Sequence, residues 1–323
     1  MLHITKDLEF PDSLDPLYDK AIKYEWISLL YMISTTFFSF IVMSNSQTMK
    51  TIWLEDTLGI IPPASFLVAS RIIQWKANKK FPYGYHKITG MSYFASSLAL
   101  FFLGVYLLID GSLVLLKNEH PNIPDVSFSG YSIWLGYIMI IALLWSSLPS
   151  TILGHLKIPL SLKLYDKILF ADSKMNKASW MSGFASIIGI IGIRMGFWWA
   201  DAGIAILISF SIINDGYSNL KNSILDLMDE VPETIEKNKT DPLLSEVRSI
   251  IKNEDWVKSF EMRFRVVGHL FFGDIFIIPK TKTIAVEKIQ SLRDKIEDRN
   301  WRLHDITITV LPERLMIPSG EKK

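Results

Sequence analysis

Hydrophobic residues gather in long runs over the first two thirds of the chain and alternate with polar residues over the last third. A helix needs about 20 mostly apolar residues to cross the roughly 30 Å hydrocarbon core of a bilayer. Six stretches meet this requirement, so we predict membrane-spanning helices at residues 25–45, 47–73, 90–116, 130–153, 168–195 and 197–217. A tight turn at Arg194–Gly196 makes the last two a helical hairpin.

The last third has the patterns of a small water-soluble domain. Asp241 is a predicted N-cap and Pro242 the first residue of a helix that ends near Asn253. Alternating patterns predict three strands, and helical spacing predicts a second helix between the last two of them. These elements are expected at residues 260–266, 271–278, 283–298 (the helix) and 305–311. The order is α-β-β-α-β, ferredoxin-like, with both helices on one face of the sheet.

The predicted fold is therefore a membrane protein with an all-α bundle of six transmembrane helices and a C-terminal cytoplasmic α+β domain. We expect five segments along the chain. They are an N-terminal segment (1–24), the six-span transmembrane domain (25–220), a linker (221–240), the α+β domain (241–313) and a tail (314–323).

The distribution of charge supports this division into two solvents. Overall, 49% of the residues are hydrophobic, 21% are charged, and the net charge of +1 gives no sign of nucleic-acid binding. Residues 88–154 hold only four charged residues, whereas residues 221–323 hold 36 of the 67. The chain has no cysteine, which excludes a disulfide scaffold.

Lysine and arginine in short loops indicate the orientation of the spans, because these residues favour the cytoplasmic side. We expect the basic loops after the second and before the fifth span to be cytoplasmic, and the second of these loops includes Lys157 and Lys163. They carry ten basic residues against three in the opposite loops. Both termini then lie in the cytoplasm, and the plasma membrane is the expected location.

Ionisable residues inside predicted spans are costly and indicate function. Glu55 and Asp56 are adjacent in the second span, just before Pro62 and Pro63, which lack amide donors and free nearby carbonyls. Carboxylate and carbonyl oxygens suit a hard divalent cation. The alternative is a proline kink with both carboxylates near the outer interface.

The fifth span carries one polar stripe, because Asp172, Met175, Asn176 and Ser179 recur at helical spacing. These side chains are candidate cation ligands, although such a stripe also packs helices together through hydrogen bonds. Asp201 is expected to stabilise the start of the sixth helix. Asp110 is expected at the membrane interface and Arg194 in a turn.

Three features together resemble the cation diffusion facilitators, proton-coupled exporters of divalent metals. The first is Phe81-Pro-Tyr-Gly-Tyr-His-Lys87, which is similar to the basic loop before their third span. The second is Ala171-Asp-Ser-Lys-Met-Asn-Lys-Ala-Ser179 with Trp199-Ala-Asp201, which resembles their fifth and sixth spans. The third is the tail pattern, with Arg263, Arg265 and Gly268 in its strand pair.

The departures from the family pattern concern its metal ligands. Where the family has Asp or His and then Asp in the second span, this chain has Glu55 and Gly59. Where the family has His and then Asp in the fifth, it has Met175 and Ser179. Three of four expected ligands are thus missing, which disfavours a tetrahedral zinc site. In the tail, Phe260 and Phe276 stand where some members have metal-binding histidines, and His269 and His304 are expected at the surface or at strand ends.

The resemblance implies efflux of a divalent cation by exchange for protons, through a site between the second and fifth spans, in a homodimer. Glu55 and Asp56 would bind the cation, Asp172 and Asn176 would complete the shell, and Met175 would be a soft ligand or a packing group. We expect hard cations such as manganese, magnesium or iron(II) as substrates, and no cofactor.

Two other classes of function stay open. A transport-inactive relative would scaffold or regulate an active metal transporter. A membrane-embedded metal enzyme would need Glu55 and Asp56 with His86 or His155, but these histidines lie at the basic ends of the spans, so we expect no enzyme.

Overall fold

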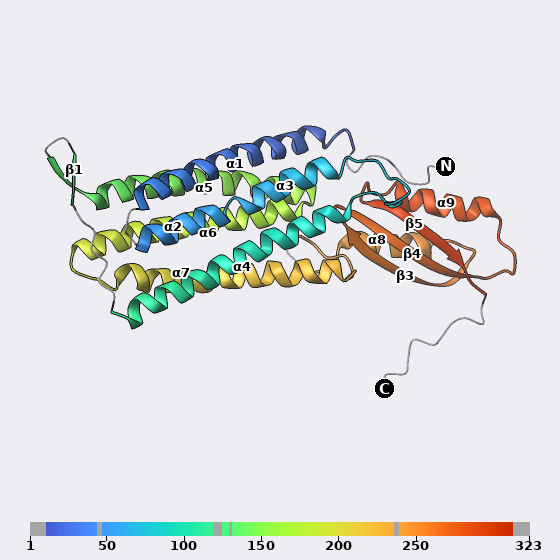
Figure 1. Cartoon of the computed structure of the whole chain (residues 1–323). Coiled ribbons are helices and arrows are strands. Elements are labelled where there is room, and N and C mark those ends of the chain that lie inside the picture. Colours follow the sequence, from blue (N-terminus) through green and yellow to red (C-terminus); the bar gives the residue numbers. More distant parts are fainter. Residues whose placement is uncertain (1–10, 44–46, 119–124, 129–130, 236–238, 313–323) are drawn as a thin grey trace. The chain divides into compact units, whose positions relative to one another are not determined.

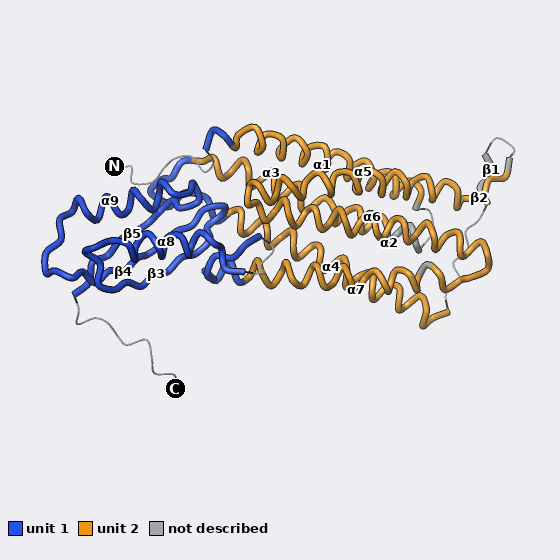
Figure 2. Tube along the Cα trace, turned by 180° about the vertical axis from the view of Figure 1, so that it is seen from behind, with its two compact units in different colours: residues 1–13, 76–87, 225–323 blue, residues 14–75, 88–224 orange. Residues whose placement is uncertain are grey.

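A computed structural model of the chain describes residues 11–43, 47–118, 125–128, 131–235 and 239–312. Its helices and strands form two compact units, labelled in Figure 1 and coloured separately in Figure 2. The helical unit comprises the described parts of residues 14–75 and 88–224, and the tail unit those of residues 1–13, 76–87 and 225–323. The first ten residues of the predicted N-terminal segment and the predicted tail (314–323) lie outside the described residues.

The helical unit is a bundle of helices that run side by side (Figure 1). In the described part of the chain these are α1 (Asp15–Met43), α2 (Gln47–Leu58), α3 (Ile61–Ile72), α4 (Lys87–Leu116), α5 (Leu135–Leu164), α6 (Lys167–Arg194) and α7 (Ala200–Leu227). Helix α6 begins at a side-chain cap, because Asp166 accepts a hydrogen bond from the backbone nitrogen of Leu169 at 2.8 Å. It ends in the predicted turn, where Gly196 has a φ of +95° that favours glycine.

The second predicted span is two helices instead of one. Helix α2 ends at Leu58, and α3 begins at Ile61 with Pro62 and Pro63 in its first turn. Proline is tolerated there, because the amide groups of a first turn have no partner within the helix. The prolines therefore end one helix and begin the next rather than kink a continuous one.

The fourth predicted span differs at both ends. Residues 131–134 belong to a two-stranded antiparallel hairpin of β1 (Asp125–Phe128) and β2 (Tyr131–Trp134), which sequence analysis did not predict. At the other end α5 continues to Leu164 and stops at Tyr165, whose φ of 53° is left-handed. The basic segment predicted as a loop before the fifth span is therefore mostly helical, and Lys157 lies inside α5.

Four helical stretches in the described part of the chain are long and apolar enough to cross a membrane. They are Asp15–Val42, Ile52–Ile72, Lys87–Leu116 and Leu135–Leu164. Helices α6 and α7 each have 28 residues, but α6 places Asp172, Lys174 and Lys177 close together. The presence of six membrane-spanning helices therefore remains a prediction.

The tail unit contains a small mixed sheet. Its elements follow in the predicted order: α8 (Pro242–Lys252), β3 (Val257–Val267), β4 (Leu270–Pro279), α9 (Val286–Glu297) and β5 (Leu303–Val310). The sheet order is β3-β4-β5, with β3 antiparallel and β5 parallel to β4. Asp241 caps α8 as predicted, accepting a hydrogen bond from Leu243 N at 3.0 Å.

Both tail helices pack against one hydrophobic core. Apolar residues of α8 and α9 meet alternate residues of β3 and β4 and the inner residues of β5. This cluster includes Leu244, Val247, Ile251, Phe264, Phe271, Ile275, Ile277, Leu292, Ile296 and Ile306, all buried. Successive strand residues point to opposite faces, so Phe272 lies on the other side of the sheet.

On that other side of the sheet lie the rings of His304 and His86. The ring of Phe272 stacks on His304 at 6.0 Å, and His86 from the 76–87 segment of the same unit lies 5.8 Å from His304. His269 and His304 were expected at the surface or at strand ends, and they lie at strand ends. They are buried there, with 3% and 4% of their surface exposed. His86 of the 76–87 segment packs beside both Phe272 and His304 and so helps to cover His304.

Candidate functional site

Charged side chains are buried inside the helical unit at two levels. In its described residues, the buried charged side chains within helices are Glu25, Glu55, Asp56, Lys157 and Asp172, each no more than 4% exposed. Ionisable groups buried in a membrane-spanning bundle are costly and mark functional sites. We call them the outer carboxylate pair, where 'outer' means nearer the turn between α6 and α7, and the lysine cluster.

The outer carboxylate pair is Glu55 and Asp56, on α2. Consecutive helical residues point about 100° apart, so the two carboxylates face different neighbours. Glu55 Oε2 accepts a hydrogen bond from Ser182 Oγ of α6 at 2.7 Å. Asp56 Oδ1 accepts one from Ser146 Oγ of α5 at 3.0 Å. The pair therefore lies where α2 meets both α5 and α6, with serine hydroxyls beside each carboxylate.

The surroundings of this pair are polar and nearly filled. Tyr31 of α1 donates to the backbone oxygen of Ser146 and so ties α1 to α5 beside Asp56. Glu55 Oε1 is buried and has no hydrogen-bond donor among the described residues. A cavity of about 10 Å³ lies beside Ser182, lined mainly by α6, α4 and α7. Such a volume holds one water molecule at most.

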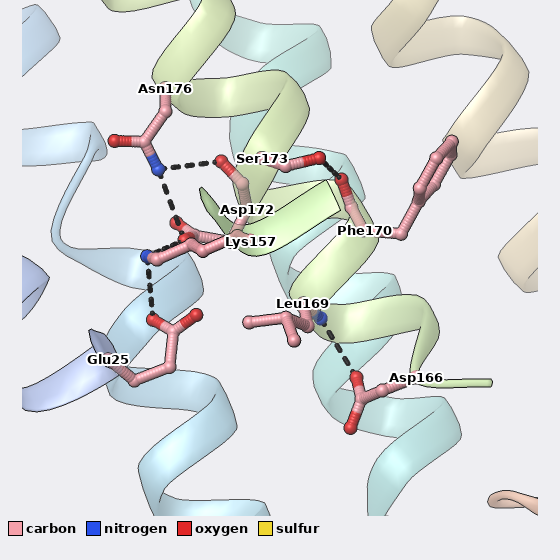
Figure 3. Close-up of polar contacts among 8 residues, drawn as sticks. All are labelled: Glu25, Lys157, Asp166, Leu169, Phe170, Asp172, Ser173 and Asn176. Carbon is pink, nitrogen blue, oxygen red and sulfur yellow. Dashed lines mark hydrogen bonds and ion pairs between the residues drawn. The ribbon is translucent and has the colours of Figure 1, made fainter. Parts of the chain in front are cut away.

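The lysine cluster consists of Glu25, Lys157, Asp172 and Asn176 (Figure 3). Lys157 Nζ donates to Glu25 Oε2 of α1 at 3.1 Å and forms a close ion pair with Asp172 of α6. Asn176 Nδ2 donates to both the backbone oxygen and Oδ2 of Asp172, at 2.9 and 3.1 Å. All four side chains are at most 1% exposed. One ammonium group from α5 thus joins α1 to α6.

The two levels are separated along the α5–α6 pair, which packs antiparallel. Gly183 packs against Ser147 at the outer level, and Gly154 lies beside Asn176 at the level of the lysine cluster. Ser182 follows Asp172 by ten residues on α6, which corresponds to about 15 Å at 1.5 Å per residue. Glu55 therefore bonds to α6 about three turns away from Asp172.

The five predicted site residues thus lie in three places. Glu55 and Asp56 form the outer carboxylate pair, while Asp172 and Asn176 belong to the lysine cluster. Met175 is fully buried in an apolar cluster with residues of α4 and α7, including Leu100, Leu103 and Ile212. The structure brings the predicted residues together in pairs, not around one point. In the described residues, no group of three or more His, Asp or Glu side chains is arranged to hold a metal ion.

Two members of the lysine cluster were not among the predicted site residues. Lys157 falls in the basic loop predicted before the fifth span, and Glu25 is the first residue of the first predicted span. A signal was present for both, since α1 buries Tyr18, Ala21, Glu25 and Ser28 at intervals of three or four residues. Helix α5 likewise buries Ser146, Ser150, Gly154, Lys157 and Ser161 on one face. Extending the helical spacing beyond the apolar runs would have found them.

The remaining histidine candidate of the helical unit, His155, is exposed on α5. Its Nδ1 lies 2.7 Å from the backbone oxygen of Thr151, one turn earlier on the same helix. His155 precedes the buried Lys157 by two residues and so faces another side of the helix.

Comparison with known protein families gives a match to more than half of the chain. A family model described as the cation efflux transmembrane domain matches residues 26–228, which covers α2 to α7 and most of α1. The match includes both buried levels except Glu25, which immediately precedes it. None of the curated proteins compared with the chain matches it.

Proposed function

The chain belongs to the cation diffusion facilitator family, and from this we propose that it exports a divalent metal cation in exchange for protons, with Glu55 and Asp56 as the cation ligands. It is an integral membrane protein of metal-cation transport rather than an enzyme.

The position of the outer carboxylate pair carries this proposal. Glu55 and Asp56 are 4% exposed and lie on α2 against α5 and α6. Burying two adjacent carboxylates without a cationic partner is unfavourable unless a cation or protons neutralise them. Their four oxygens and the neighbouring hydroxyls of Ser146 and Ser182 form an all-oxygen environment. Such ligands favour hard cations such as Mn²⁺, Mg²⁺ or Fe²⁺ over zinc.

Competition between the cation and protons couples their movements. A carboxylate binds a metal ion only when deprotonated, so protonation from one side of the membrane releases the ion there. Alternating exposure of the pair to the two sides would then convert a proton gradient into cation efflux. The break between α2 and α3 at Gly59–Ile60 begins one helical turn after Glu55, so a change of bend there would move the pair relative to α3.

Transport by reconstituted protein tests this proposal. Full-length chain in proteoliposomes is given Mn²⁺ outside at two internal pH values, and uptake is followed with an enclosed fluorescent indicator. Glu55→Gln with Asp56→Asn should reduce the flux to below about one tenth, because the variant keeps the shape of both groups and removes both charges. The matched control, Asp255→Asn with Glu261→Gln, makes the same changes at exposed positions in the tail unit. Unchanged flux in the first variant would refute the ligand assignment.

A specific observation also favours the second candidate, a transport-inactive relative that scaffolds or regulates an active transporter. Gly59, Met175 and Ser179 replace ligands usual in the family, and Met175 is packed among apolar side chains. An inactive relative would show no flux above that of empty liposomes and no thermal stabilisation by any divalent metal.

The assembly and orientation belong to the same proposal. By resemblance we propose a homodimer in the plasma membrane with both termini in the cytoplasm. Because the chain has no cysteine, single cysteines introduced at exposed positions such as Ser249 can be labelled from one side of sealed vesicles. Labelling of Ser249→Cys from the extracellular side would contradict the orientation.

A further inference from the structure

Lys157 has no role in the proposed exchange at Glu55 and Asp56, yet it is fully buried inside the helical unit. Its side chain is 0% exposed, and its two carboxylate partners, Glu25 and Asp172, are 0% and 1% exposed. A buried ion pair gains little net stability over a well-packed apolar replacement, because both charges lose their hydration. Stability alone therefore gives a weak reason for placing a lysine here.

The cluster has more negative charge and more acceptor oxygens than one ammonium group satisfies. Glu25 and Asp172 together carry a formal charge of −2 against +1 for Lys157. Glu25 Oε1 and Asn176 Oδ1 are both buried and have no hydrogen-bond donor among the described residues. Glu25 Oε2 and Asp172 Oδ2 contact the ammonium group, while Asn176 turns its amide nitrogen toward Asp172 and its oxygen away (Figure 3). With Asn176 turned over, the two carboxylates and the amide would supply up to five side-chain oxygens from α1 and α6. This is the ligand chemistry of a hard cation.

We propose that Glu25, Asp172 and Asn176 form a second cation site, which Lys157 occupies in this state as a tethered cation and from which the transported cation displaces it. The inference rests on the proposed function, since it adds a second station for the same cation. It assigns Asp172 and Asn176 to this station together with Glu25, which lies just outside the part of the chain that the family match covers.

The polar face of α5 connects this station to the outer carboxylate pair. Ser146, which bonds to Asp56, and Lys157 are eleven residues apart on that helix, or about 16 Å. Ser147, Ser150 and Gly154 lie between them on the same buried face. Helices α5 and α6 pack closely along this face, so a cation that moves from Asp56 along it would have to part them before it reaches the lysine cluster. There the lysine must give way, which separates α1 from α6 and links occupancy to helix movement.

A fixed brace between three helices is the competing explanation, and the two differ in what removal of the lysine does. If the cluster is only a brace, removing Lys157 leaves two buried carboxylates that destabilise the protein and bind nothing. If it is a cation site, removing the Lys157 ammonium group leaves it free to bind a metal cation from solution. The site gains one negative charge when Lys157 becomes neutral, and affinity for divalent cations rises with the charge of the ligands.

The test measures Mn²⁺ binding to purified full-length chain by equilibrium dialysis. All variants carry Glu55→Gln and Asp56→Asn, so the outer carboxylate pair does not contribute. Adding Lys157→Met should create one Mn²⁺ site per chain, bound about tenfold or more tightly than by the background protein. Adding Asp172→Asn as well should abolish it. The matched control is Lys163→Met, an exposed lysine of α5, which should bind no more than the background.

A second variant keeps the test decisive if Lys157→Met alone does not fold. Lys157→Met with Glu25→Gln leaves the formal charge of the cluster at −1, as in the natural chain, and should retain a weaker Mn²⁺ site that Asp172→Asn removes. Mn²⁺ should also raise the unfolding temperature of the lysine variants and not that of their Asp172→Asn derivatives. No gain of binding and no Mn²⁺-dependent stabilisation in either lysine variant would overturn the inference. The proposed function fails separately, if Glu55→Gln with Asp56→Asn leaves flux unchanged.

Discussion

Asp241 in the tail unit provides a prediction whose magnitude follows from two contacts. One carboxylate oxygen caps α8 by accepting from Leu243 N at 3.0 Å. The other accepts from Arg302 Nη1 at 2.8 Å, and the two side chains of this ion pair are only 4% and 6% exposed. The Arg302 guanidinium also lies 4.1 Å from the ring centroid of Phe271, which holds it in the interior. Asp241 therefore joins the start of α8 to the residue just before β5.

Two substitutions separate these contacts. Asparagine caps helices about as well as aspartate, so Asp241→Asn removes the negative charge and keeps the cap. Leaving the other half of a buried ion pair without its partner costs about 3–5 kcal/mol. Alanine also removes the cap, which adds about 1 kcal/mol. We expect losses of about 3–5 kcal/mol for Asp241→Asn and about 1 kcal/mol more for Asp241→Ala.

Hydrogen exchange followed by mass spectrometry measures this loss in the full-length protein. Peptides from residues 242–252 and 303–310 report opening of α8 and β5, and each 1.4 kcal/mol changes the exchange rate about tenfold. Asp241→Asn should accelerate exchange by about a hundredfold to several thousandfold. Adding Arg302→Met should restore much of the protection, because the asparagine and methionine side chains leave no buried charge. Acceleration below about fivefold, or no recovery in the double variant, would refute this account of the ion pair.

Two further predictions concern the helical unit, and thermal unfolding of the purified full-length chain checks both. A Cβ at Gly216 would lie 2.6 Å from a backbone atom of α4, so Gly216→Ala should lower the free energy of unfolding by about 1–3 kcal/mol. The control is Gly203→Ala on the same helix, where the nearest atom to an added Cβ is 3.5 Å away and the change should be neutral or stabilising. Equal stabilities of the two variants would contradict the close α4–α7 packing. Ser182→Ala removes the 2.7 Å hydrogen bond to Glu55 and should lower the free energy of unfolding by about 1.5–3 kcal/mol if that carboxylate is charged. Ser186→Ala, one turn away on α6, is the control. Equal stabilities of the two variants would mean that the Ser182 hydroxyl does not stabilise Glu55.

Local patterns in the sequence predicted much of the fold. Asp241 and Pro242 predicted the start of α8, and alternation predicted the strands of the tail unit, because caps and strand faces depend on neighbouring residues. Apolar runs located the long helices but misplaced their ends. Helix α5 extends eleven residues past the predicted end of its span, since a helix continues through basic residues once its buried face packs against α6.

The candidate site was only partly predictable. Glu55 and Asp56 stood out because they are charges within an apolar run, and Asp172 because it opens a polar stripe on α6. The sequence identified these three carboxylates as lying within helices, but it did not place Lys157 in one. It did not determine which of them meet.

Tertiary structure decided the pairing. Glu25 and Lys157 are 132 residues apart in the chain, and only the packing of α1 against α5, and of α5 against α6, brings them and Asp172 together. That packing also turns Glu55 toward Ser182 and Asp56 toward Ser146, and buries Met175 among apolar side chains. The physical reason is that helical periodicity predicts which residues share a face of one helix, whereas contact between charges depends on the depth at which separate helices meet.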